Sequence, residues 1–378
     1  MNYPEERWMV RGLSHHRVPL DLREHWTPDA ILLEALRQDL IKCPAVIEAV
    51  VLSTCNRLEI YAASPQEAGE DVAGVLDRII ASRLGCEAWA LEPYLEGFES
   101  RDMVEHLFRV AAGLESQMVG ETEIFGQVKQ AYQDSVKCGL IGKRFHKLFQ
   151  KCFQWGKKAR TETGIGRGSV SVPTVATELA ERIFGDLTTC SLLVVGTGEM
   201  AEASMKIFKS RLCGQVAFCG RNRDRLDELA RQHGEGGFDL DDLGKRLGEF
   251  DVVLTSTAAP GPVIFPDMVD AALEKRRMRP LFLIDVAVPR DVDPECGERD
   301  QVFLYNLDDL AVMANENLEM RRAEVTRCGE MLRGAAQEFT ERMGWKRDSE
   351  MGRVDPVQCH LPGSGGGVDN PIRREHPG

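Results

Sequence analysis

The cysteine with the most polar surroundings in this chain is Cys55, in the segment Ser53-Thr54-Cys55-Asn56-Arg57. Apolar runs at 46–52 and 58–62 flank it, so we expect two strands with Cys55 on the connection between them. The Arg57 guanidinium would favour the thiolate if the two side chains converge. Because a thiolate attacks carbonyl carbon well, covalent catalysis is one interpretation of this segment. The other is a buried structural cysteine between strands.

A second group of residues has the spacing of a dinucleotide-binding turn. Gly196-Thr197-Gly198-Glu199-Met200-Ala201 follows the apolar run 191–195 and begins a helical pattern. In a strand–turn–helix of this kind, glycines let the backbone approach a pyrophosphate at the helix amino terminus. The next apolar run ends in Gly220-Arg221, without the acidic residue that holds the ribose of NAD, so Arg221 favours NADPH. A glycine turn without a nucleotide is the alternative.

The elements around these residues indicate a multidomain α/β protein. Strand candidates at 8–14, 46–52 and 58–62, followed by helical periodicity to residue 163, predict an α+β amino-terminal domain. Residues 166–305 alternate short apolar runs with helical segments, which predicts a Rossmann-like domain with a parallel sheet. The expected boundaries are 1–165 for a catalytic thiol domain, 166–305 for the nucleotide domain, 306–345 for a long helix and 346–378 for a tail.

The carboxy-terminal part is expected to form one long charged helix from residue 306 to about residue 343. Leu318, Val325, Leu332 and Phe339 form an apolar heptad column, but Arg321 interrupts the companion column. This weak seam predicts a concentration-dependent homodimer. The last 33 residues contain six Gly and four Pro, so a disordered tail is expected.

Composition excludes several classes of protein. Of 378 residues, 43% are hydrophobic and 28% are charged, which is typical of soluble globular proteins. No apolar run approaches the ~18 residues that span a bilayer, and the amino terminus lacks a secretory pattern, so we expect a cytoplasmic protein. The eleven cysteines are scattered and never form Cys-x-x-Cys, so neither a disulfide framework nor a zinc site is expected.

Charge is distributed unevenly along the chain. The net charge is −13, yet residues 129–167 contain ten Lys or Arg against Asp134 and Glu162. Such a basic helical segment could attract the phosphates of a nucleic acid. A solvated helix face with internal ion pairs is the alternative.

Several motifs, in this order, resemble glutamyl-tRNA reductases. A lone histidine such as His106 is usually structural, but here it begins a longer match that extends to residue 129. The resemblance covers roughly residues 8–342. The matching stretches are 12–15 with Pro19, Arg23 and Glu24, then 51–59, 106–129, 160–163, the turn at Gly196, 285–293 and 305–310.

The resemblance implies an enzyme that starts tetrapyrrole synthesis by reducing glutamyl-tRNA to glutamate-1-semialdehyde with NADPH. Cys55 would take the glutamyl group as a thioester, His106 would orient the ester or move a proton, and Arg57 would pair with the substrate's free carboxylate. A glutamate-1-semialdehyde aminomutase is a further expected partner. The implied substrate-binding residues are Thr54, Asn56, Arg57, Ser116, Glu121, Thr122, Glu123 and Gln127.

The sequence differs from the family pattern at two places, and it also leaves two other functions open. Glu123 stands where an amide is usual, and the chain turns low-complexity near Lys346, where relatives continue into a helical dimerisation domain. One alternative is a thiol-dependent aldehyde dehydrogenase, although its nucleotide domain would ordinarily precede the thiol. The other is a non-catalytic scaffold that binds NADP or tRNA.

Overall fold

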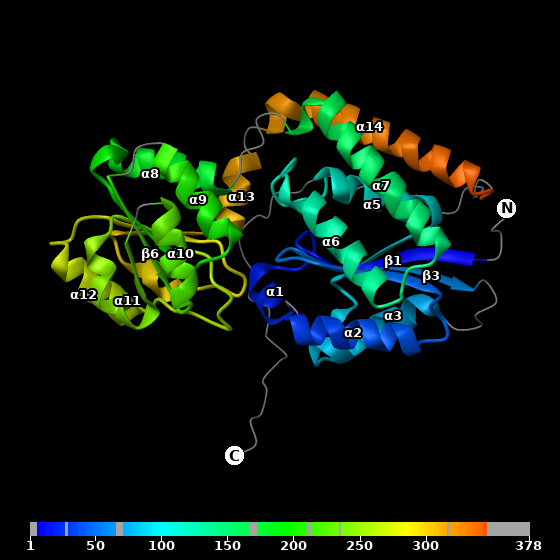
Figure 1. Ribbon diagram of the computed structural model, residues 1–378, viewed down its shortest axis with the longest axis horizontal. Helices are drawn as coiled ribbons and strands as arrows, with labels where there is room; N and C mark the ends of the chain where they lie inside the picture. Colours follow the sequence, from blue (N-terminus) through cyan, green and yellow to red (C-terminus); the bar gives the residue numbers. More distant parts are fainter. Residues whose placement is uncertain are drawn as a thin grey trace, which may run out of the picture.

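The computed structural model describes residues 6–26, 29–65, 71–166, 172–210, 214–233, 236–315 and 318–345. Two bodies lie side by side, each built on its own sheet (Figure 1). The predicted tail, 346–378, and Arg167 lie outside the described residues. None of the helices in the described ranges is long and apolar enough to cross a membrane.

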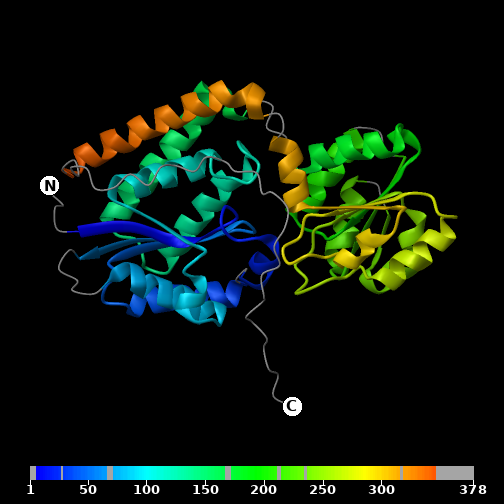
Figure 2. The ribbon, with the colours of Figure 1, turned by 180° about the vertical axis from the view of Figure 1, so that it is seen from behind.

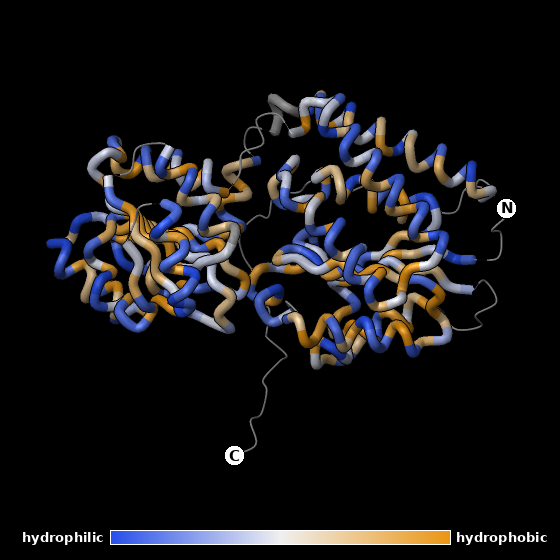
Figure 3. The backbone as a smooth tube through the Cα atoms, in the orientation of Figure 1, coloured by the Kyte–Doolittle hydropathy of each residue, from blue (hydrophilic) through white to orange (hydrophobic). Residues whose placement is uncertain are grey.

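The first body contains a four-stranded antiparallel sheet in the order β2-β3-β1-β4. Side chains alternate across it, so Met9 and Ile60 face one helical layer whereas Trp8 and Tyr61 face the other. Both layers are apolar where they meet the sheet (Figure 3). The elements are β1 (Glu6–Ser14), α1 (Leu20–Trp26), α2 (Ala30–Lys42), β2 (Glu48–Ser53), β3 (Arg57–Pro65), α3 (Val72–Leu84), α4 (Ala88–Leu91), β4 (Leu95–Glu99), α5 (Ser100–Ala112), α6 (Glu123–Lys137) and α7 (Lys143–Glu162).

The second body is a doubly wound α/β domain with six parallel strands in the order β10-β9-β8-β5-β6-β7. The strand order reverses between β5 and β8, and ligands of such sheets bind in the crevice at that point. The elements are α8 (Val172–Phe184), β5 (Ser191–Val195), α9 (Glu199–Ser210), β6 (Gln215–Gly220), α10 (Arg223–His233), β7 (Gly236–Asp239), α11 (Leu243–Arg246), β8 (Val252–Thr255), α12 (Pro266–Lys275), β9 (Leu281–Asp285) and β10 (Val302–Asn306).

The predicted fold class is confirmed, but three strands were not predicted. β4 lies in the stretch expected to be helical, and β7 and β10 extend the parallel sheet at its two edges. β7 is only four residues long and starts with two glycines, and β4 has only one buried residue, so neither shows the apolar pattern of a strand. Pairing with a neighbouring strand decides their conformation.

The prediction of one long helix over 306–343 is wrong. The structure contains α13 (Leu307–Asn315) and α14 (Leu318–Arg342), and Figures 1 and 2 show them as separate segments. Leu307 and Leu310 belong to the core of the nucleotide domain, whereas Cys328 and Leu332 belong to the core of the first body. Each helix therefore follows the domain on which it packs.

The apolar column assigned to a homodimer is used inside the chain. Leu332 and Phe339 are buried in the hydrophobic core of the first body, and Val325 packs against that core. The Leu318 side chain is not among the described side chains. The exposed residues of α14 from Arg322 onward are charged, polar or small. The predicted seam is thus an intramolecular contact, and a dimer would need another surface.

Candidate active site

Cys55 lies at the tip of the β2–β3 hairpin, as expected for a residue on a strand connection. Ser53 pairs with Leu58, the Thr54 backbone N–H donates to the Arg57 carbonyl (2.8 Å), and the Thr54 hydroxyl accepts from the Asn56 N–H (3.1 Å). The residue is exposed and lines a pocket with the apolar side chains of Val18 and Trp26. The residue is thus accessible at the tip of the hairpin, although protein atoms surround its sulfur.

The Arg57 guanidinium is directed to Glu59 and the Glu115 carbonyl, so the convergence with Cys55 that would favour the thiolate is not found. Protein crowding around the sulfur, with the carboxylates of Glu121 and Glu123, raises the pKa of Cys55 to about 11, and the opposing effect of Arg23 is smaller. The Cys55 side chain is therefore a protonated thiol at neutral pH. Activation must come from a change in this electrostatic environment.

Arg57 is instead part of a buried ionic network. Its guanidinium contacts the Glu59 carboxylate at 2.7 Å and donates to the Glu115 carbonyl. The Tyr61 hydroxyl donates to the other Glu59 oxygen at 2.6 Å. Burial alone would raise the pKa of Glu59, but Arg57 and His106 outweigh it and lower the pKa to about 2. Arg57 is only 5% exposed, and its guanidinium is already paired with Glu59. It therefore does not offer the free guanidinium that was predicted to bind a substrate carboxylate.

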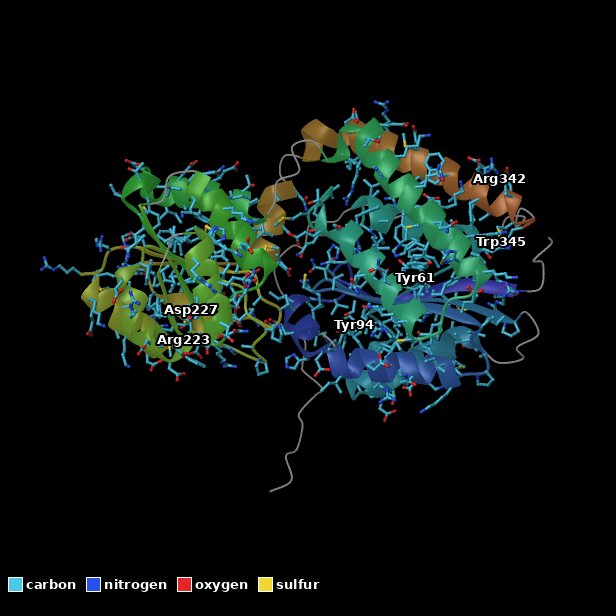
Figure 4. The ribbon with its side chains drawn as sticks, in the orientation of Figure 1. Tyr61, Tyr94, Arg223, Asp227, Arg342 and Trp345 are labelled. Atoms are coloured by element: carbon cyan, nitrogen blue, oxygen red, sulfur yellow. The ribbon has the colours of Figure 1, made fainter. Side chains whose placement is uncertain are left out.

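His106 belongs to the same network. Its Nε2 lies 3.1 Å from Glu59 Oε1, and its ring stacks on Phe98 at 4.6 Å between centroids. Figure 4 shows Tyr61 inside the first body, between its sheet and helices. The structure thus places His106 behind the hairpin with Arg57 and Glu59, so it supports the loop that carries Cys55.

The other predicted substrate residues lie on the segment between α5 and α6 and on the first turns of α6. The buried Ser116 hydroxyl is near enough to lower the pKa of Glu121, without a hydrogen bond of normal geometry. Burial and Glu123 outweigh this effect of Ser116, so the pKa of Glu121 is raised.

Arg160 holds the backbone of this segment by donating to the carbonyls of Glu121 (2.8 Å) and Thr122 (3.2 Å). Glu121 and Glu123 are near enough to raise the pKa of the thiol, Thr122 is exposed, and Gln127 lies one turn further along α6.

The alkylation rate of Cys55 should report its raised pKa. Below the pKa the thiolate fraction rises tenfold per pH unit, so reaction with iodoacetamide at this site should rise about tenfold per unit from pH 7 to 10 without levelling off. Mass spectrometry of the modified peptide separates Cys55 from the other cysteines. A plateau below pH 9 would contradict the raised pKa.

The predicted dinucleotide turn has the required geometry. Gly196 follows β5 with φ +121°, and its N–H donates to the Cys219 carbonyl at 2.8 Å. α9 begins at Glu199, and the side chain of Glu199 is not among the described side chains. Ala201, in the first turn of α9, is buried. Gly198 has no neighbour within 4 Å of the position of an added Cβ, so the backbone is open to a ligand there. These residues fit a pyrophosphate at the helix amino terminus.

Gly196→Ala should disrupt the nucleotide domain. A Cβ at this position would lie 2.3 Å from the Ser256 carbonyl oxygen, in a backbone conformation that L-residues rarely adopt. We expect a loss of about 2 kcal/mol or more in the free energy of unfolding, and lost NADPH binding. Gly198→Ala is the matched control, because its added methyl meets open space and should leave the urea midpoint unchanged. Equal midpoints for both variants would refute the close approach.

Arg221 is exposed where β6 ends, beyond the buried Gly220. Asn222 caps α10 by accepting from the Arg225 N–H at 3.0 Å, and Arg225 reaches the Thr197 carbonyl at 3.4 Å. Arg223, at the start of α10, is labelled in Figure 4. Arg225 is itself paired with Glu202 and Glu228, so Arg221 is the exposed cation at the end of the strand that packs beside the turn.

Glu59 and Arg23 are two site residues that the sequence interpretation did not assign. Glu59 had a usable signal, because Arg57, Glu59 and Tyr61 alternate along one strand and so share a face. A cation, an anion and a phenol on a buried face must pair with one another. Arg23 had no such signal, since its partners come from distant parts of the chain.

Comparison with known proteins identifies the family. Residues 11–163 match the family model described as "Glutamyl-tRNAGlu reductase, N-terminal domain" and residues 178–313 match "Shikimate / quinate 5-dehydrogenase". A glutamyl-tRNA reductase from Magnetococcus marinus is 36% identical over 365 residues, covering 94% of this chain and 86% of the relative. The chain belongs to the glutamyl-tRNA reductase family. Another reductase, from Nitrosomonas europaea, is 38% identical over 87% of this chain and 77% of the relative.

A solved glutamyl-tRNA reductase from Methanopyrus kandleri is 36% identical, with a TM-score of 0.47, and the match covers 89% of this chain and 80% of that one. As a glutamyl-tRNA reductase family member, the protein is an oxidoreductase, and its dehydrogenase-type domain supports a nicotinamide cofactor.

Proposed function

We propose that this protein reduces the glutamyl ester of glutamyl-tRNA to glutamate-1-semialdehyde, with NADPH as the reductant and a thioester on Cys55 as the intermediate. The observation that carries the proposal is a thiol at an exposed hairpin tip, in a reductase-family chain whose second domain has an open dinucleotide turn. The proposed site comprises Cys55 and its loop, the Ser116–Gln127 segment, His106 as a supporting residue, and the Gly196 turn with Arg221.

The carboxylates near the thiol suggest how the substrate activates it. Burial of the sulfur raises the pKa of Cys55 most, and the carboxylates of Glu121 and Glu123 raise it further in the free protein. An aminoacyl ester carries a positively charged α-amino group, which these carboxylates would attract. Neutralising them would remove two of the contributions that raise the thiol's pKa and leave the opposing effect of Arg23 in place, so binding of substrate would shift the equilibrium toward the thiolate. The nucleophile would then be formed mainly when its target is present.

The proposed reaction has two balanced steps. The Cys55 sulfur bonds to the ester carbonyl carbon, the bond to the tRNA ribose oxygen breaks, and the thiol proton ends on that oxygen. NADPH supplies a hydride that, with a proton, converts the thioester to an aldehyde and regenerates the thiol. The direct test is to incubate the protein with glutamyl-tRNA, with and without NADPH, and measure semialdehyde. Oxidation of a small aldehyde, or no turnover, would favour the alternative functions.

The tRNA is proposed to contact exposed lysines of α6 and α7. Lys143 and Lys147 follow one another at helical spacing on the exposed face of α7, with Lys157 further along and Lys129 on α6. Arg144 of the same segment pairs with Glu6 and Glu48. The attraction would weaken as salt concentration rises. Because the aldehyde product is reactive, direct transfer to an aminomutase is proposed as well.

Arg221→Ala should shift the cofactor preference. Removing the guanidinium deletes a charge-assisted contact that only the 2′-phosphate of NADPH can make, so the Kd for NADPH should rise about tenfold and that for NADH should change little. Arg231→Ala, an exposed arginine further along α10, is the matched control for loss of charge. Equal weakening of both cofactors would contradict a 2′-phosphate contact.

A further inference from the structure

The short helix α1 connects the two bodies. It lies at the end of the first body that faces the nucleotide domain in both views (Figures 1 and 2). Arg290 of the nucleotide domain contacts both Glu24 oxygens, at 2.6 and 2.9 Å, and Asp21 at 2.8 Å. The Arg290 backbone N–H also donates to Glu24 at 2.8 Å. α1 is therefore fixed from the nucleotide side.

Arg23 of α1 bridges the thiol loop and the nucleotide domain. One guanidinium nitrogen donates to the Asn56 side-chain oxygen, next to Cys55 in the hairpin, and another donates to the Asp308 carboxylate on the first turn of α13. Arg23 is only 6% exposed. A cation buried to this extent needs its anion, since an unpaired buried charge costs several kcal/mol. The orientation of Asn56 thus depends on Asp308.

A second contact reaches the other side of the substrate pocket. The Gln117 amide donates to the same Asp308 oxygen at 2.5 Å, and the Asn315 amide donates to the Gln117 carbonyl at 2.7 Å. Gln117 follows Ser116 directly in the chain. The two ends of α13 therefore hold the segment that contains Gln117, and Asp308 contacts both this segment and Arg23.

The nucleotide side of this contact is close to the dinucleotide turn. Asp291 follows Arg290 directly in the sequence, and its carboxylate accepts from the Thr257 N–H at 2.7 Å. Ser256, the residue before Thr257, forms the wall against which Gly196 packs. Hydrogen bonds and packing thus connect the turn that would hold the cofactor with α1 and the thiol loop.

We propose that Arg23 is a positioning residue for the Cys55 loop and that Asp308 holds it in this role, so that docking of the nucleotide domain arranges the thiol for acyl transfer. The inference rests on the proposed function. Acyl transfer needs the sulfur at a defined distance and angle from the ester carbonyl, and small displacements of such groups lower rates strongly. Loss of the Asp308 carboxylate would remove this ion pair from Arg23 and weaken the hold of Arg23 on Asn56.

The test uses the full chain and single-turnover formation of the glutamyl thioester in the absence of NADPH. In Asp308→Asn this rate constant should fall about tenfold or more, because the carboxylate no longer holds Arg23. The Kd values for glutamyl-tRNA and for NADPH should stay within about twofold, since neither ligand is proposed to touch Asp308. Asp309→Asn is the matched control, because the Asp309 carboxylate lies on the same turn and accepts from the Asn306 N–H at 2.9 Å. Its thioester rate should equal that of the wild type.

Coupling is tested by a double-mutant cycle. If Asp308 acts through Arg23 on Asn56, then Asn56→Ala and Asp308→Asn combined should slow the thioester step no more than the worse single change. Multiplicative effects of the two changes, or an unchanged rate in Asp308→Asn, would overturn the proposal. If Asp308→Asn does not fold, the same rate is measured in Arg23→Lys, which keeps the cation but cannot bridge Asn56 and Asp308. The proposal predicts a slower thioester step in this variant, and an unchanged rate would overturn it. A wild-type protein that forms neither thioester nor semialdehyde would refute the proposed function instead.

Discussion

Cys55→Ser is expected to abolish both thioester formation and production of semialdehyde. The change is nearly isosteric, and Cys55 is an exposed residue at a hairpin tip, so the fold and the NADPH affinity should be retained. Oxygen is a far poorer nucleophile than sulfur at neutral pH, and the crowding that raises the thiol's pKa would oppose ionisation of a hydroxyl still more. We expect turnover to fall by at least about 10⁴-fold.

The measurement is acid-stable labelling of the protein by radioactive glutamyl-tRNA, followed by an NADPH-dependent assay of the aldehyde. Cys86→Ser is a suitable control, because Cys86 is a partly exposed cysteine at the end of α3 in the same domain and has no proposed role. The Cys86→Ser variant should be labelled as the wild type is and should produce the aldehyde at the wild-type rate. Labelling of Cys55→Ser at the wild-type level would place the acyl group on another residue.

Glu59→Gln should cause the largest loss of stability among the site substitutions. Glu59 is the buried anion to which Arg57, His106 and Tyr61 all bind. Replacing the carboxylate by an amide leaves the buried Arg57 without its counter-ion, and breaking such a pair typically costs about 3–5 kcal/mol. Urea unfolding should therefore show a strongly lowered midpoint, and any remaining folded protein should form the thioester slowly, because the loop next to Arg57 loses its support.

Tyr61→Phe is the matched comparison, since it removes one hydrogen bond to Glu59 and retains both charges. It should cost only about 1–2 kcal/mol. The pKa of Glu59 lies near 2, below its ordinary value, so the carboxylate stabilises the fold above about pH 4.5 and this contribution is lost as the pH falls toward 2. Wild-type stability should decline over that window, and Glu59→Gln should lack this component. A midpoint for Glu59→Gln no lower than that of Tyr61→Phe would mean that the network is not a stability determinant.

The local features of this protein were accessible from the sequence because they depend on neighbours in the chain. The hairpin that carries Cys55 follows from two apolar runs around a polar pentapeptide, and the Gly196 turn follows from glycine spacing after a strand. The alternation of runs and helices over 166–305 specified a parallel sheet. In each case conformation is set within about ten residues, so a pattern suffices.

The tertiary structure decided which groups meet. Arg57 lies two residues from Cys55 and would have favoured the thiolate if the side chains converged, but strand alternation and burial direct its guanidinium to Glu59. The pKa of the thiol is instead raised by burial first and by the more distant Glu121 and Glu123 after it. The apolar column of α14 indicated a partner correctly but not which one, and the partner is the chain's own first body. An amphipathic face requires apolar surface to cover it without specifying whose surface that is. For the same reason the contact of Arg23 with Asp308, 285 residues apart, could be found only once both domains were in place.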